Sequence, residues 1–270
     1  MRSLTLFAFA GLAACSGEKT TSPTGETGTP TDTDTQTPPP AGGFTVEGIV
    51  LNAATQQPVA EGLCVSVVDP TPALGGGEPL TLVSGTVGAG GVFSLADVST
   101  TSTVGLLVDV RDCTGDTVYP SATGIAADEY AGLGEGDVLG DRVAFSIDAA
   151  LRDGLAASAS LAGYAGDLSA DGYFFGFTLD TTGAALGGVS VSCLGTCNAT
   201  LYMDTDPADG LFTTGGAPNT ATDAAAGAVF VIGAAPIGQY SADDGGAHTF
   251  GSQLNGSNPG IATITAFYGQ

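Results

Sequence analysis

Residues 44–51 read FTVEGIVL, and residues 173–180 read YFFGFTLD. Both stretches are rich in the β-branched and aromatic side chains that favour β-strands. Further short apolar runs follow each stretch, separated by turn residues such as Gly, Pro and Asp. These runs lie at residues 63–68, 79–86, 91–98 and 104–110, and then at 188–193, 199–203, 228–232 and 261–268. Short strands at this spacing predict an all-β chain that forms two antiparallel β-sandwiches.

One segment between the two groups of strands has a helical pattern. In residues 146–159, Ile147, Leu151 and Leu155 recur at every fourth position and so share one face of a helix, with Ser146 as the expected N-cap. The sequence thus predicts a short intervening α-helix. The expected divisions are a first sandwich at residues 44–125, a connector with this helix at 126–171, and a second sandwich at 172–270.

The chain opens with the pattern of an export signal. A positive start precedes an uncharged apolar run at residues 4–14, which is too short to span a bilayer. The run ends in Leu-Ala-Ala before Cys15, which resembles the lipobox of bacterial lipoproteins. The resemblance implies that residues 1–14 are a signal peptide and that Cys15 carries several fatty acyl chains, palmitate among them, because one chain anchors only marginally. An ordinary signal peptide with a chance cysteine is the alternative.

The segment after Cys15 is expected to be a spacer. Residues 16–43 consist mainly of Thr, Pro, Gly and Asp and contain no large apolar side chain. Such a segment cannot bury enough apolar surface to offset its ordering entropy, so residues 15–43 are predicted to form a disordered, lipidated tether. Ser16 follows the cysteine, and by the sorting pattern of enterobacterial lipoproteins this points to the outer membrane of the cell envelope.

The excess of acidic over basic residues restricts which binding partners the protein can have. The chain has 5 basic and 28 acidic residues and a formal net charge of −23, which argues against binding nucleic acid or anionic lipid. The acidity fits either solubility or cation binding. One acidic group, Asp204, Asp206 and Asp209, resembles the first half of an EF-hand loop and is the candidate Ca²⁺ site. Pro207 interrupts this group and no Glu closes it, so a solvated turn is the alternative.

Four cysteines remain besides Cys15, and an even number in an exported chain predicts two disulfides. We expect Cys64–Cys113 and Cys193–Cys197, one in each sandwich. Cys64 begins a predicted strand and Cys113 follows another strand of the same domain, whereas Cys193 and Cys197 flank a short turn. Half of a zinc site at the second pair is the alternative, but only one histidine is present to complete it.

Glycine-rich motifs recur in the two groups of strands. Both groups resemble the carboxypeptidase regulatory-like domain, a transthyretin-like sandwich of the broader immunoglobulin-like kind, and the second group matches better. The resemblance implies that the motifs build turns and carry no chemistry. They are Val46-x-Gly48-x-Val50 in the first group, and Gly176-x-x-x-Asp180 and Thr222-Asp223 in the second.

The sequence contains no recognisable catalytic motif. His248 is the one histidine, and without a Gly-x-Ser-x-Gly turn it is expected to be a loop residue and not a base. No Walker loop is present, so nucleotide binding has no support. We therefore expect no enzyme and no resident cofactor.

The expected function is a non-catalytic envelope lipoprotein with a structural, adhesive or partner-binding role, directed at an envelope protein or a glycan. The alternative is a carbohydrate-binding or hydrolase-accessory lipoprotein. The alternative would be favoured by an exposed row of aromatic side chains on one face. The candidate row is Tyr173, Phe174, Tyr202 and Tyr240.

Overall fold

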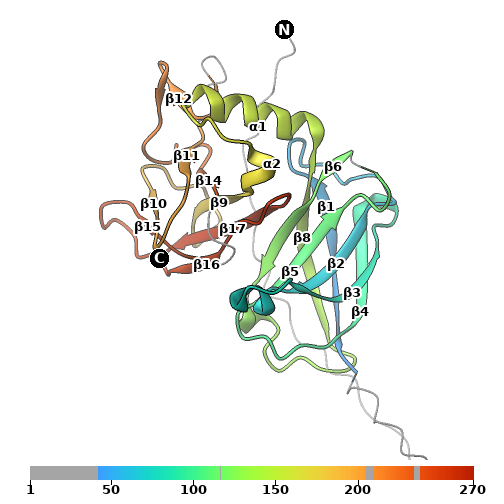
Figure 1. Cartoon of the computed structure of the whole chain (residues 1–270). Coiled ribbons are helices and arrows are strands. Elements are labelled where there is room, and N and C mark those ends of the chain that lie inside the picture. The colour runs from blue at the N-terminus through green and yellow to red at the C-terminus, as the bar shows by residue number, and fades with distance from the viewer. Residues whose placement is uncertain (1–41, 116, 205–209, 234–237) are drawn as a thin grey trace, which may run out of the picture.

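The computed structural model describes residues 42–115, 117–204, 210–233 and 238–270 (Figure 1). Cys15, the predicted signal peptide and residues 16–41 of the predicted tether lie outside these residues. Asp206 and Asp209 of the candidate Ca²⁺ site also lie outside them.

The first half of the chain is a β-sandwich. One of its layers is a four-stranded sheet with the order β4-β1-β8-β6. Its strands are β1 (Phe44–Asn52), β4 (Val92–Val98), β6 (Val118–Tyr119) and β8 (Val138–Asp148). The facing layer consists of β2 (Cys64–Asp69), β3 (Leu80–Thr86), β5 (Leu106–Arg111) and β7 (Ser121–Ile125). Three short 3₁₀ turns lie at Thr71–Gly75, Ala89–Gly91 and Ala127–Glu129.

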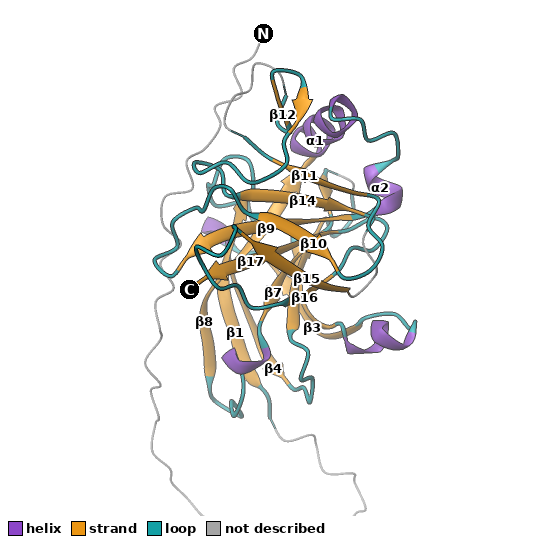
Figure 2. Cartoon of the chain, turned by 90° about the vertical axis from the view of Figure 1, so that its left-hand side faces the viewer, coloured by secondary structure: helices purple, strands orange, loops and turns teal. Residues whose placement is uncertain are grey.

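The second half repeats this layered arrangement. One layer contains β9 (Tyr173–Asp180), β11 (Ala199–Tyr202), β14 (Ala228–Ile232) and β17 (Ala262–Gly269). The other is a three-stranded sheet of β10 (Ser190–Cys193), β15 (Gly238–Asp243) and β16 (Gln253–Asn255). A small hairpin, β12 (Thr213–Thr214) with β13 (Ala217–Pro218), lies near the end of α1 (Figure 2). The prediction of an all-β chain built of sandwiches is confirmed.

One sheet runs through both halves. Its eight strands have the order β11-β14-β9-β17-β7-β5-β2-β3. β17 makes the connection, because it pairs in parallel with β9 along its whole length and with β7 from Ala262 to Ile264. Most other neighbours are antiparallel, as expected, and β1 with β8 is the further parallel pair. The two sandwiches therefore share a hydrogen-bonded sheet.

A shared hydrophobic core reinforces this connection. α1 (Ala149–Leu161) and α2 (Leu168–Asp171) cover one face of the second half. Beneath them, Tyr119 and Phe145 of the first half join Tyr173 and Phe230 of the second in one buried cluster. The rings of Tyr119 and Tyr173 stack with their centroids 5.5 Å apart. Because buried aromatic side chains contribute large apolar areas, this cluster binds the halves into one packed body.

The structure differs from the expected connector in one respect. Residues 138–148 form β8 of the first sandwich, which pairs with β1 over most of its length. Ser146 belongs to this strand and is not the N-cap of the helix. Asp148 caps α1 instead, and its carboxylate accepts a hydrogen bond of 2.7 Å from the Leu151 amide. In the described part of the chain, no helix has the length and hydropathy needed to cross a bilayer.

Candidate functional site

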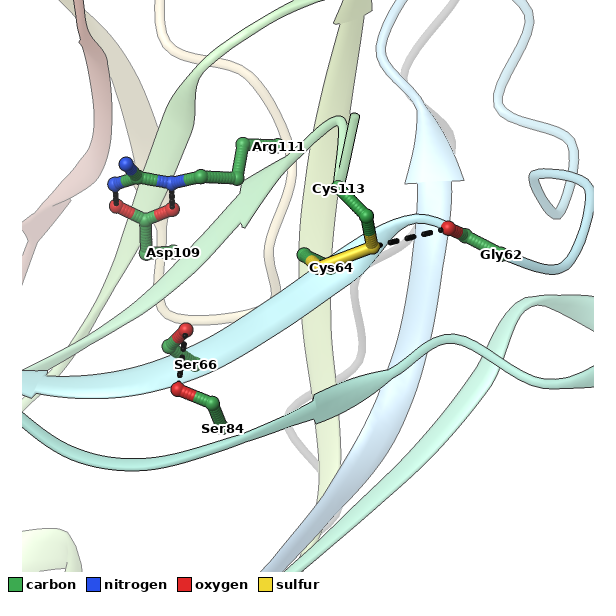
Figure 3. Close-up of a disulfide and its surroundings, with 7 residues drawn as sticks. All are labelled: Gly62, Cys64, Ser66, Ser84, Asp109, Arg111 and Cys113. Atoms are coloured by element: carbon green, nitrogen blue, oxygen red, sulfur yellow. Dashed lines mark hydrogen bonds and ion pairs between the residues drawn. A yellow bond between two sulfur atoms is a disulfide. The ribbon is translucent and has the colours of Figure 1, made fainter. Parts of the chain in front are cut away.

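The first expected disulfide joins two neighbouring strands. Cys64 is the first residue of β2, and Cys113 follows β5, the strand beside it (Figure 3). The structure links them, with their Cα atoms 5.0 Å apart and 49 positions separating them in sequence. The bridge thus closes a long loop that contains β2, β3, β4 and β5.

The second disulfide crosses between layers. Cys193 ends β10 in the three-stranded sheet, and Cys197 precedes β11 in the eight-stranded sheet. The structure links them with a Cα separation of 6.5 Å. A disulfide uses both sulfurs that the alternative zinc site needs, and no group of three potential metal ligands occurs among the residues that the structure describes.

The arginines of the described chain are all paired with carboxylates. Arg111 makes a bidentate ion pair with Asp109 near the first disulfide (Figure 3). The hydrogen bonds of this pair raise the pKa of Arg111. The remaining pairs are Arg142 with Glu129 and Arg152 with Asp153. Within residues 42–115, 117–204, 210–233 and 238–270, no arginine or lysine is therefore left unpaired to receive a phosphate group.

Asp204 is the one described member of the candidate Ca²⁺ group. Its side chain is buried and accepts hydrogen bonds from Thr214 at 2.8 Å and from the Asn219 amide at 3.0 Å. Asn219 also donates to the Tyr202 carbonyl oxygen at 3.1 Å, so these side chains join the end of β11 to the hairpin. This network holds the loop together, and calcium binding here stays a prediction.

The candidate aromatic row is absent from the surface. Tyr173, Phe174, Tyr202 and Tyr240 are all buried. Tyr173 and Phe174 point to opposite faces of β9, because successive strand residues alternate, and they belong to different core clusters. These four side chains therefore form no platform for sugar rings. Tyr268 on β17 is the aromatic side chain that is strongly exposed in the described structure, at 45 %.

His248 lies in the loop after β15. Its ring nitrogen Nδ1 is 2.5 Å from an oxygen of Asp244, and its backbone amide donates to the same carboxylate at 3.0 Å. These hydrogen bonds lower the pKa of Asp244. The His248–Asp244 pair closes a surface loop, which fits the expected loop role.

The Thr222-Asp223 motif closes a buried turn. The Thr222 hydroxyl donates to the Leu186 carbonyl at 2.8 Å and accepts a bond of 3.1 Å from the Val189 amide. Asp223 accepts a hydrogen bond of 2.8 Å from the Ala225 amide. The motif satisfies backbone groups where the layers meet, so it has a structural role.

We expect Thr222→Val to destabilise the body by about 1–3 kcal/mol, because it leaves the buried Val189 amide without its partner. Urea unfolding of the purified protein measures this loss. Thr220→Val is the matched control, since Thr220 is exposed. Equal unfolding free energies for the two variants would show that the Thr222 hydrogen bonds contribute nothing.

A large hollow lies where the two halves meet. It is an open cleft with a volume of about 2190 Å³, lined by β1 and β8 of the first half and by β9 and β17 of the second. Ile49, Val143, Leu179 and Tyr268 give it apolar walls. A cleft at the junction of two sandwiches is a usual place for a binding site, and it is the candidate functional site of this protein. No local sequence pattern predicts this cleft, because its walls come from segments that are distant in the sequence.

Comparisons with known proteins give only distant likenesses. No protein-family model matches the sequence, and no curated protein matches it. The Bacillus anthracis TIE protein is 8% identical with a TM-score of 0.24, over 84% of this chain and 34% of that chain, so this chain spans about a third of its length. The shaft pilin SpaA of Lactobacillus rhamnosus GG is 9% identical with a TM-score of 0.24, over 85% and 98% of the two chains. The minor pilin GBS52 of Streptococcus agalactiae is 9% identical with a TM-score of 0.22, over 84% and 96%.

Proposed function

We propose that this chain is a lipid-anchored protein of the bacterial cell surface with a structural or adhesive role and no catalytic activity. In this proposal Cys15 carries the lipid, residues 16–43 form the spacer, and the paired sandwiches are the displayed body. The sandwiches are proposed to be relatives of the carboxypeptidase regulatory-like domain. The outer membrane is the proposed location, from Ser16 after the acylated cysteine.

The observation that carries the proposal is the eight-stranded sheet that runs through both sandwiches. Strand pairing between β17 and β7, together with the buried cluster at the junction, makes the halves one body. β1, the first strand of the described chain, begins at the end of the first sandwich that is remote from α1 (Figure 1). A tether attached at this end of the two-sandwich body would hold the opposite end, with α1, away from the membrane.

The carbohydrate-binding alternative receives no support from the described surface. The four aromatic side chains that would favour it are buried in the core. A protein or peptide partner therefore fits the body better than a glycan. We propose partner binding through the junction cleft as the basis of the adhesive role.

Surface display is tested by treating intact cells with trypsin. Lys19, in the predicted tether, is the only lysine of the chain. The described arginines lie in β5, β8 and α1, where regular structure resists cleavage. We expect trypsin to release one fragment that begins at Thr20 and retains the whole body, as mass spectrometry of the supernatant would show.

Lys19→Gln is the matched control, and we expect this variant to stay on the cells. Release that requires permeabilised cells would place the body on the periplasmic side and contradict surface display. Degradation of the body into several peptides would contradict the single packed unit.

A further inference from the structure

One edge of β17 borders the junction cleft. β17 pairs with β9 from Ala262 to Gly269, but its pairing with β7 ends at Ile264. Among the described residues, Thr265 to Tyr268 thus pair on one side only, and Thr265, Ala266 and Tyr268 line the cleft. Unpaired backbone groups of a strand edge are a template for one more strand.

This edge differs from the outer edges of the first sandwich. β3 carries an extra residue opposite β2 between Val67 and Val68, and β4 carries one opposite β1 between Phe44 and Val46. Such bulges twist an edge away from further pairing. The β17 edge has no bulge and carries no charge over Thr265–Tyr268. Phe250 pairs with Gly269 only beyond this stretch, so these four residues remain open to an added strand.

Two buried polar atoms border the same cleft. The hydroxyl of Thr123 and the amide nitrogen of Asn255 have no hydrogen-bond partner in the described structure, and both residues line the cleft. Nearly all buried polar atoms in native proteins are paired, so unpaired ones call for an explanation such as a ligand. Thr123 sits beside Ile264, where β7 and β17 separate.

The charged side chains that line the cleft indicate which kind of partner it can bind. Glu47, Glu129, Asp137 and Asp141 line it, against one arginine, Arg142, which is already paired with Glu129. Acidic lining around apolar walls attracts basic, amphipathic chains and repels acidic ones. The acidic tether of this protein and a second copy of this acidic chain are therefore disfavoured occupants.

We propose that the junction cleft binds an extended basic peptide segment of an envelope partner, which adds as a strand to the β17 edge at Thr265–Tyr268. Main-chain hydrogen bonds to this edge hold the segment. Its apolar side chains pack on Leu179 and Tyr268, and its basic side chains face the carboxylates. The inference rests on the proposed partner-binding role, but it does not require the lipid anchor.

The test uses the mature full-length protein in mild detergent and fluorescein-labelled peptides of about ten residues. One peptide alternates Val and Lys, a second alternates Val and Glu, and a third is the Val–Lys peptide with alternate backbone amides methylated. Fluorescence anisotropy measures binding. We expect the first peptide to bind, the second not to bind, and the third to bind at least about tenfold more weakly, because methylation removes strand hydrogen bonds.

Charge reversal locates the site. Glu47→Lys changes a carboxylate of the cleft, and Glu61→Lys makes the same net change at an exposed residue outside it. We expect Glu47→Lys to weaken binding of the Val–Lys peptide about tenfold and Glu61→Lys to leave it unchanged. Thermal unfolding checks that both variants fold.

The proposal is overturned by any of four results: absence of binding, equal binding of the methylated peptide, equal effects of the two charge reversals, or a dimer in light scattering that Glu47→Lys dissociates. The last result would assign the cleft to a second copy. Because the experiment is independent of lipidation, its failure is distinct from failure of the anchor.

Discussion

In cells that produce the Cys15→Ser variant, we expect the protein to move almost entirely from the membrane fraction to the soluble fraction. Serine lacks the thiol that receives the acyl chains. Each methylene that a bilayer buries contributes about 0.8 kcal/mol, so loss of several chains removes the whole anchoring energy. Ultracentrifugation followed by immunoblotting measures the distribution.

Ser16→Ala is the matched control, because it alters the neighbouring residue and leaves Cys15 in place. This variant should sediment with membranes as the unaltered protein does. We also expect equal melting temperatures for the bodies of both variants, because residue 15 precedes the first sandwich. A Cys15→Ser protein that still sediments with membranes would refute the lipid anchor.

The strands of the fold were largely predictable because each has a strong local signal. Residues 44–51 and 173–180 became β1 and β9, since their β-branched and aromatic side chains suit a pleated, buried surface. β8 was missed for a physical reason. An extra residue at Gly140 and Asp141 shifts its register against β1, and Asp141 adopts a positive φ of 57°. That bulge breaks the alternation by which strands are recognised.

The candidate site was not predictable in the same way. β7 is a short strand with Ser121, Thr123 and Gly124, so its local signal is weak. Its partner β17 lies at the other end of the chain, and no local pattern encodes a parallel pairing over such a distance. The cleft borders the point where that pairing stops, at Ile264. The disulfides, in contrast, followed from cysteines placed at the ends of predicted strands.

Loss of the Cys64–Cys113 disulfide is expected to have the largest effect on stability. In the chain-entropy model, closing a loop of about 50 residues contributes about 4 kcal/mol, whereas a loop of about five residues contributes about 2 kcal/mol. The two bridges span 49 and 4 positions respectively. The double variant Cys64→Ser/Cys113→Ser should therefore lose about 4 kcal/mol of unfolding free energy. Since small domains have only about 5–15 kcal/mol in total, this loss is a large fraction of the stability of the body.

The double variant Cys193→Ser/Cys197→Ser is the matched comparison, because it removes the same number of sulfurs from a short loop. We expect it to lose about half as much stability and to keep its cooperative transition. Urea unfolding under non-reducing conditions gives both values, and non-reducing peptide mapping of the unaltered protein checks the pairing first. A peptide that joins Cys113 to Cys193 would contradict it. Equal losses of unfolding free energy in the two variants would contradict the dependence on loop length. Such a result would indicate that native packing around each disulfide sets its contribution to stability.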